Sequence, residues 1–169
     1  VKGKSVHPGT AKNVMINACY VAMEFNSLLP AEQRPEHTEK REGFFMLNEM
    51  SGDIENAKLE YIVRDHDRLK FEERKKLMQS ALEYINAKHG NVAKLELTDT
   101  YYNMGEVVEP HTEIIDLAVN SMKEIGIEPI IQPIRGGTDG SKLSFMGLPC
   151  PNIFAGGHNF HGRFEMVAI

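Results

Sequence analysis

The sequence has no tryptophan, only two cysteines among its 169 residues, and no apolar run of the roughly 18 to 20 residues that cross a bilayer. Cys19 and Cys150 are too few for a disulfide framework or a four-ligand zinc site, so cysteine usage predicts a cytoplasmic protein. The segment Val1–Ser5 lacks the apolar stretch of a signal peptide. The sequence starts with Val1 rather than methionine, and we therefore expect it to be a piece of a longer chain.

An excess of positive charge is also missing. Lysine and arginine number 19 against 24 aspartates and glutamates, which gives a formal net charge of −5 and a pI of about 5.8. Because no overall positive field would attract nucleic acid or an anionic membrane, we expect neither as a partner. With 41% hydrophobic and 25% charged residues, the chain can form one ordinary domain or two small ones.

The first part of the chain carries the pattern of strands mixed with helices. Residues 1–6 read as the end of a strand, and apolar residues at helical spacing then predict a helix from an N-cap at Thr10 to a stop at Pro30. Alternating apolar and polar residues predict strands at 44–50 and 57–63, which a short turn joins into a hairpin.

A second helix and a last strand complete this pattern. Asp67 is a candidate N-cap and Gly90 a candidate C-terminal stop for the helix, and residues 92–97 follow as a strand. The order strand, helix, strand, strand, helix, strand predicts an α+β, ferredoxin-like βαββαβ domain over residues 1–104. In that arrangement both helices cover one face of a four-stranded sheet.

From residue 105 the pattern changes. A helix that Pro110 and His111 open, short strands at 129–134 and 152–155, and glycine-rich loops after them are typical of a parallel α/β sheet. Two strands cannot enclose a core, so we expect residues 105–169 to be part of a larger α/β layer.

The glycine-rich loops hold most of the candidate chemistry. Arg135 precedes two glycines, where a guanidinium suits bidentate capture of a carboxylate, although a surface salt bridge fits the same pattern. His158 and His161 could face one metal ion, but zinc needs three or four ligands, and ordinary polar loop histidines fit the spacing as well. His7, just before Pro8, is either an aimed hydrogen-bond donor or a solvated side chain.

A dense charge run, Arg64–Arg68, lies at the predicted junction between the second hairpin strand and the second helix. Such runs are usually solvated, and their local ion pairs contribute little to stability. On spacing alone, the run therefore predicts a solvated corner.

Six stretches occur together and in order along essentially the whole chain. They are residues 5–13, 64–68, 97–104, 133–140, 147–154 and 157–162. As a set they closely resemble the peptidase T family, the tripeptide aminopeptidases of the dinuclear-zinc aminopeptidase and carboxypeptidase superfamily. Several long motifs in one order are far more specific than any of them alone.

The resemblance implies an α/β catalytic domain that holds two zinc ions and is interrupted by a smaller α+β lid, which usually also forms the dimer interface. Residues 1–104 are then the lid and dimerisation domain, and residues 105–169 are the C-terminal portion of the catalytic domain. His161 matches the last zinc ligand of the family, whereas the other ligands and the general base lie outside this chain. His158 stands where related sequences can carry a tyrosine and is not assigned to metal.

The resemblance also implies roles for four other residues. His7 matches the lid histidine that donates to the developing oxyanion, often across the dimer, and Arg135 matches the arginine that fixes the terminal carboxylate of the substrate. Arg64 and Asn103 are further candidates for substrate binding. The expected function is removal of the N-terminal residue from tripeptides, and the chain alone is expected to be inactive. A related dipeptidase or aminoacylase, or a non-catalytic dimerisation or peptide-binding module, are the alternatives.

Overall fold

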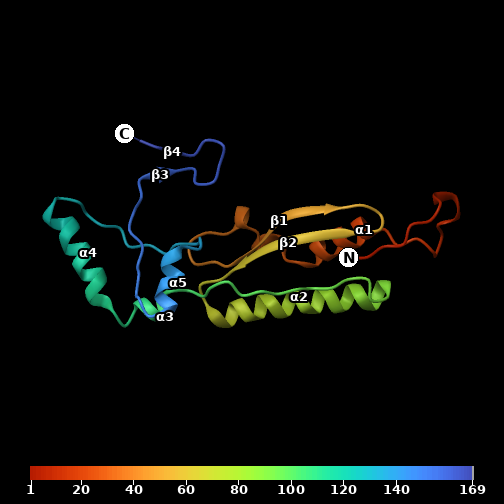
Figure 1. The fold of residues 1–169 in the computed structure, drawn as a ribbon, viewed down its shortest axis with the longest axis horizontal. Coiled ribbons are helices and arrows are strands. Elements are labelled where there is room, and N and C mark those ends of the chain that lie inside the picture. The colour runs from red at the N-terminus through yellow and green to blue at the C-terminus, as the bar shows by residue number, and fades with distance from the viewer. Residues whose placement is uncertain (169) are drawn as a thin grey trace. The chain divides into compact units, whose positions relative to one another are not determined.

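The computed structural model describes residues 1–168 and confirms the predicted α+β class (Figure 1). The chain divides into two compact units. The first holds Val1–Asn103 and Gln132–Gly136, and the second holds Met104–Ile131 and the described residues from Gly137 onward. Within residues 1–168, none of the helices combines the length and apolar character needed to traverse a bilayer.

A long antiparallel hairpin forms the sheet of the first unit. Strand β1 (Phe44–Gly52) pairs with β2 (Ala57–Arg64), as the alternation predicts. One Asp53 carboxylate oxygen accepts hydrogen bonds from the backbone N–H groups of Glu55 and Asn56, at 2.8 Å each, and so closes the turn.

Helix α1 (Ala18–Leu28) begins later than the sequence predicts. Its N-cap is Asn17, whose side-chain oxygen accepts from backbone N–H groups of the first turn. The hydroxyl of Thr10, the predicted cap, instead donates to the His7 carbonyl within a short 3₁₀ turn, η1 (Pro8–Thr10). Asn13 then adopts a φ of 59°, which interrupts any helix through this segment. The predicted start at Thr10 is therefore wrong.

Helix α2 (Arg68–His89) has both of its predicted ends. The Asp67 carboxylate accepts from the Lys70 backbone N–H at 3.0 Å and caps the first turn. Gly90 ends the helix with a φ of 88°, a left-handed conformation that glycine adopts without steric cost.

Both helices pack against the same face of the hairpin, as predicted. The largest cluster of buried side chains joins them to β1, and partly buried residues of β2 pack against it. Its members are Val21 and Phe25 from α1, Leu29 just after α1, Phe45 from β1, and Met78, Ala81 and Ile85 from α2. The candidate residues of this unit lie toward the two ends of the hairpin. This core holds the middle of the hairpin against the two helices.

The two outer strands of the predicted four-stranded sheet are extended segments with few backbone pairings. The Lys2 N–H donates to the Val92 carbonyl at 2.7 Å, Val1 and Gly3 bond to the turn end of the hairpin, and Lys4 pairs with Ile16. The Asn86 side chain bonds both the N–H and the carbonyl of Ala93, at 2.9 and 3.0 Å, so these groups do not join a strand ladder. Regular pairing in this unit is therefore confined to β1 and β2 among the described residues.

The second unit contains three helices and a minimal hairpin. The helices are α3 (Gly105–Val108), α4 (Thr112–Glu124) and α5 (Asp139–Phe145), and α4 matches the predicted helix after Pro110 and His111. The hairpin pairs β3 (Gly157–His158) with β4 (Met166–Val167).

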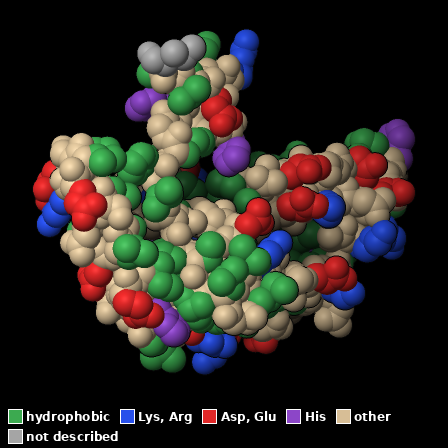
Figure 2. Space-filling model, turned by 60° about the vertical axis from the view of Figure 1, so that its left-hand side comes forward, with side chains coloured by type: hydrophobic (Ala, Val, Ile, Leu, Met, Phe, Trp, Pro, Cys, Tyr) green, Lys and Arg blue, Asp and Glu red, His purple; other side chains and the backbone are tan. Residues whose placement is uncertain are grey.

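The predicted strands at 129–134 and 152–155 are not formed as strands. Ile130 and Ile153 are 85% and 69% exposed, and hydrophobic side chains are widespread on the surface that Figure 2 shows. A parallel strand exists only where neighbouring strands supply its hydrogen bonds, and within residues 1–168 no strand pairs with these segments. They remain apolar segments without a sheet.

Candidate functional site

The charge run Arg64–Arg68 forms an ordered junction between β2 and α2. Asp65 accepts from Arg74 Nε at 2.9 Å, and the two side chains are 2% and 13% exposed. The Arg64 guanidinium lies over the ring of Tyr101, at 4.6 Å from its centroid. The prediction of a solvated corner holds for Asp67 and Arg68, which are exposed, and is wrong for Asp65, whose side chain is buried in its pair with Arg74.

Gly43 makes room for the buried pair at this junction. A Cβ atom at Gly43 would lie 2.2 Å from Asp65 Oδ2, 2.6 Å from Arg74 Nε and 2.6 Å from the Arg64 carbonyl oxygen. The Arg74 guanidinium also donates to the Gln33 side chain, which ties α2 to the loop before β1. The close approach of three chain segments thus depends on a residue without a side chain.

Arg135 is held against the loop that precedes β1. Its Nη1 donates to the Thr38 carbonyl at 2.6 Å, and Nη2 donates to the Thr38 hydroxyl at 2.6 Å and to the Glu42 carbonyl at 3.1 Å. The guanidinium lies 4.9 Å from the centre of the Phe44 ring. Arg135 Nε is buried and has no hydrogen-bond partner within residues 1–168. The guanidinium is therefore fixed in orientation, partly desolvated, and not neutralised by a carboxylate in the described part of the chain.

His66 and Asn103 connect Arg135 to the charged junction. His66 Nε2 lies 3.0 Å from the Ile134 carbonyl, and because a carbonyl only accepts, the ring donates this hydrogen bond. Asn103 Nδ2 donates to the His66 carbonyl at 3.0 Å. These contacts hold the residue before Arg135 against the β2–α2 junction.

Three of the predicted substrate-binding residues thus share one end of the first unit. Arg64 pairs with Phe44 at the open end of the hairpin, and Asn103 and Arg135 are bonded to the same region. Sequence reasoning missed Thr38 and the His66 side chain as their supports. The only sequence signal for His66 is its place within the motif at 64–68, since its partner lies 68 positions away.

His7 lies toward the other end of the hairpin. The residues before it bond to the turn between β1 and β2, and Figure 1 shows the following loop, in red, beyond that turn. His7 is exposed, and its Nδ1 accepts from the Gly9 N–H at 3.1 Å. Nδ1 is the acceptor in this contact, which leaves Nε2 as the ring nitrogen that can donate a hydrogen bond. The structure does not bring His7 together with Arg135.

His161 lies in the loop between β3 and β4. It is exposed with a φ of 63°, and its backbone N–H donates to Glu165 at 2.9 Å. Across residues 1–168, no three or more His, Cys, Asp or Glu side chains gather as a metal site. His158 lies in β3 and is exposed as well. The exposed ring of His161 is suited to be one ligand of a larger metal site. The described residues do not form a metal centre by themselves.

The family of the chain is identified from residues of the first unit. The sequence profile described as "Peptidase dimerisation domain" matches residues 1–93, more than half of the chain. This chain belongs to the peptidase dimerisation domain family. The matched residues include His7 and Arg64, whereas Asn103, Arg135 and His161 lie beyond them. The peptidase dimerisation domain thus accounts for the hairpin and both long helices, but not for the second unit.

Proteins named peptidase T are similar to nearly all of the chain, as the sequence motifs predict. The one from Parabacteroides distasonis is 60% identical over 168 residues, which are 99% of this chain and 41% of that protein. Those from Bacillus velezensis and Alkaliphilus oremlandii are 58% and 52% identical, over 99% and 100% of this chain and 41% and 42% of those proteins. The chain spans about two fifths of the length of these curated relatives.

The fold of the chain also has a relative among solved structures. The crystal structure of aminopeptidase PepT from Bacillus cereus matches with a TM-score of 0.68, over 97% of this chain and 44% of that chain. The aligned residues are 18% identical, so this likeness shows the fold alone.

Proposed function

We propose that this chain is a portion of a cytoplasmic tripeptide aminopeptidase that works as a homodimer. The observation that carries the proposal is the identity of 52 to 60% to proteins named peptidase T across both units. In this proposal residues 1–104 are the lid and dimerisation domain, and residues 105–169 are the C-terminal portion of an α/β catalytic domain. The exposed apolar segments 129–134 and 152–155 suit strands that pair within such a domain.

Arg135 is the proposed holder of the terminal carboxylate of the peptide. A planar cation of fixed orientation suits a carboxylate, and the contacts to Thr38, Glu42 and Phe44 provide that orientation. Arg64 and Asn103 adjoin it and are proposed to support the same end of the substrate. Because the carboxylate would sit at a fixed distance from the cleaved bond, this arrangement would select peptides by length.

His7 is the proposed donor to the oxyanion that forms when the first peptide bond is attacked. Its Nδ1 accepts from the Gly9 N–H, which leaves Nε2–H available for this hydrogen bond on an exposed side chain. Its place away from Arg135 suits a histidine that serves the active site of the neighbouring subunit. A backbone hydrogen bond that fixes the tautomer would keep the donor ready before the substrate binds.

His161 is the proposed ligand from this chain to a centre of two zinc ions. When bound, zinc supplies a water with a pKa near about 7, which can attack a peptide carbonyl at neutral pH. The exposed position of the His161 ring leaves its nitrogens accessible to an ion. The remaining ligands and the general base are proposed to come from outside this chain.

The test is His161→Ala in the full-length protein, with His158→Ala as the matched control from the same hairpin. We expect His161→Ala to lose zinc and to lower tripeptide hydrolysis by at least about 100-fold, because a missing ligand weakens the metal site. The control should keep both. Zinc content is measured by mass spectrometry and hydrolysis by release of the free amino acid. A His161→Ala enzyme that retains zinc and activity overturns the assignment.

Substrate comparison separates the related enzyme classes. For a tripeptide aminopeptidase, kcat/KM for tripeptides should exceed the values for dipeptides and for acylated amino acids. The opposite order would indicate a dipeptidase or an aminoacylase. Tripeptide hydrolysis by residues 1–169 alone, with added zinc, would contradict the proposal that most metal ligands lie elsewhere.

A further inference from the structure

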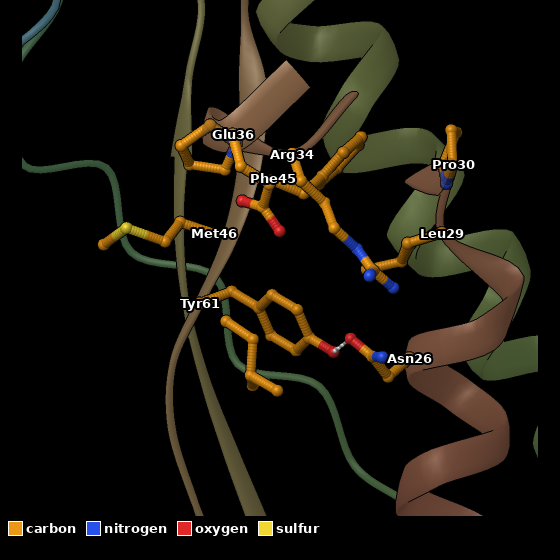
Figure 3. Close-up of a pocket in the computed structure, with 10 residues that line it drawn as sticks. Asn26, Leu29, Pro30, Arg34, Glu36, Phe45, Met46 and Tyr61 are labelled. Carbon is orange, nitrogen blue, oxygen red and sulfur yellow. Dashed lines mark hydrogen bonds between the residues drawn. The ribbon is translucent and has the colours of Figure 1, made fainter. Parts of the chain in front are cut away.

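A cavity lies in the first unit, and its lining includes none of the residues discussed above as candidates for catalysis or substrate binding. Its volume is 250 Å³, and it opens between the end of α1, the loop of residues 30–36 and the hairpin (Figure 3). Leu29, Phe45 and Met46 supply apolar walls. Polar groups of four other lining residues determine which ligand the cavity can accept.

Arg34 provides a cation that the described part of the chain leaves without a direct partner. The side chain is half-buried and directs its guanidinium into the cavity (Figure 3). Across residues 1–168, this guanidinium forms no hydrogen bond or ion pair, although the Glu36 carboxylate lines the same cavity. A half-buried cation without a direct ion pair is unfavourable, and a carboxylate bound in contact with it would relieve that cost.

Tyr61 and Asn26 supply the polar groups of the wall opposite Arg34. The Tyr61 hydroxyl donates to Asn26 Oδ1 at 2.9 Å, and Figure 3 shows this bond across the cavity from Arg34. Burial raises the pKa of Tyr61 to about 12, while the charge of Arg34 opposes the shift, so the phenol stays protonated. Asn26 Oδ1 accepts this hydrogen bond, and the Asn26 Nδ2 group can donate to a ligand.

The cavity therefore offers a cation, an anion and an apolar wall within a small volume. Its 250 Å³ is below the range of about 300 to 1,000 Å³ typical of sites for drug-sized ligands, which favours a ligand smaller than a tripeptide. We propose that it binds a free α-amino acid with an apolar side chain. The carboxylate lies on Arg34, the ammonium group lies on Glu36, and the side chain packs against Leu29 and Met46.

None of the residues that line this cavity is among those proposed above to bind the substrate. Its biological meaning rests on the proposed function, because an aminopeptidase releases free amino acids and the cavity would then bind a product. The binding itself requires no catalysis. It can therefore be tested on the 169-residue chain, independently of zinc and hydrolysis.

The first experiment varies the ligand and leaves the protein intact. L-leucine, L-leucinamide and N-acetyl-L-leucine are titrated into the chain, with the Met46 methyl NMR signal as the reporter. We expect saturable binding of L-leucine and at least about 10-fold weaker binding of the other two, because each lacks one of the two charges. Equal binding of the three overturns the proposal, and so does a Met46 signal that L-leucine does not perturb. Binding of N-acetyl-L-leucine as tight as that of L-leucine would indicate a peptide C-terminus instead, and it also overturns the proposal.

The second experiment varies the protein. Arg34→Gln and Glu36→Gln should each weaken L-leucine binding at least about 10-fold. Arg41→Gln, at an exposed arginine of the same loop region, should leave it unchanged. Far-UV circular dichroism checks that each variant is folded. Unchanged affinity in both cavity variants contradicts the assignment, whereas it leaves the peptidase proposal and its zinc test unaffected.

Discussion

Gly43 shows how a single residue controls the junction of β1, β2 and α2. An added Cβ would meet Asp65 Oδ2 and Arg74 Nε within 2.2 and 2.6 Å, and the rigid Arg64 carbonyl at 2.6 Å cannot move away. We therefore expect Gly43→Ala to separate a buried ion pair and to lower the free energy of unfolding by about 2 to 4 kcal/mol. Urea denaturation followed by circular dichroism measures the change.

Gly136→Ala is the matched control for this substitution. No atom lies within 4 Å of a Cβ built at Gly136, so the added methyl group meets open space. The free energy of unfolding should change by no more than about 0.5 kcal/mol. Similar losses for the two variants would mean that the packing around Gly43 is not the cause.

Individual residues were predictable from the sequence where their partners are neighbours in it. Asp67 caps α2 through the N–H of Lys70, three positions away, and such a pattern can be read directly. Arg135 bonds Thr38 across 97 positions, which no local spacing records. The resemblance supplied the importance of Arg135, but only the structure shows what holds it.

The start of α1 provides a test at the scale of an element. The Asn17 side chain caps the helix through two backbone N–H groups, at 3.0 and 3.4 Å, whereas Thr10 belongs to a separate 3₁₀ turn. Asn17→Ala should therefore lower the free energy of unfolding by about 1 kcal/mol, and Thr10→Ala should change it much less. Thermal or urea denaturation of the two variants measures the difference. A larger effect at Thr10 would restore the helix start that the sequence predicts.

An acid-sensitive contact joins α1 to the end of α2. Glu24 accepts from Lys88 at 2.5 Å and bonds His89 at 2.9 Å, and these partners hold the Glu24 pKa below its ordinary value of 4.5. A carboxyl with a lowered pKa stabilises the fold above the pKa of the unfolded chain, and this contribution is lost as pH falls through the folded-state pKa. Acidification below about pH 4.5 should thus reduce the urea midpoint more in the wild type than in Glu24→Gln.

Glu83→Gln is the control for this pH dependence, because Glu83 is exposed on α2. It should keep the acid-induced loss of the wild type. If Glu24→Gln loses stability on acidification as steeply as the wild type and Glu83→Gln do, the contact does not contribute to the pH dependence.

Elements, like residues, were predictable where their bonding partners are close in the chain. The hairpin of β1 and β2 closes through its own turn, so alternation and turn residues were enough to place it. The segment 129–134 has the apolar composition of a buried strand, yet the described residues offer it no sheet neighbour. Composition indicates what a segment can bury, whereas strand formation also depends on which backbone groups it meets.

At the scale of the whole molecule, the candidate residues belong to different parts of the chain. Arg64, Asn103 and Arg135 share one end of the first unit, His7 follows the segment bonded to its other end, and His161 belongs to the second unit. A dimerisation domain offers a physical reason for this distribution, because two copies can complete each other's active sites. In a two-fold dimer, each contribution made across the interface is made twice.

Mixed dimers of the full-length protein test whether His7 acts in the neighbouring subunit. A His7→Ala subunit keeps its metal ligand, and a His161→Ala subunit keeps its oxyanion donor. If His7 serves the partner, each mixed dimer has one intact site, and random assortment should restore about a quarter of wild-type turnover. Each variant alone should be nearly inactive. If His7 serves its own subunit, every site in the mixture lacks one of the two groups, and turnover should not exceed the mean of the parent variants. Tripeptide hydrolysis after co-expression therefore decides between the two arrangements.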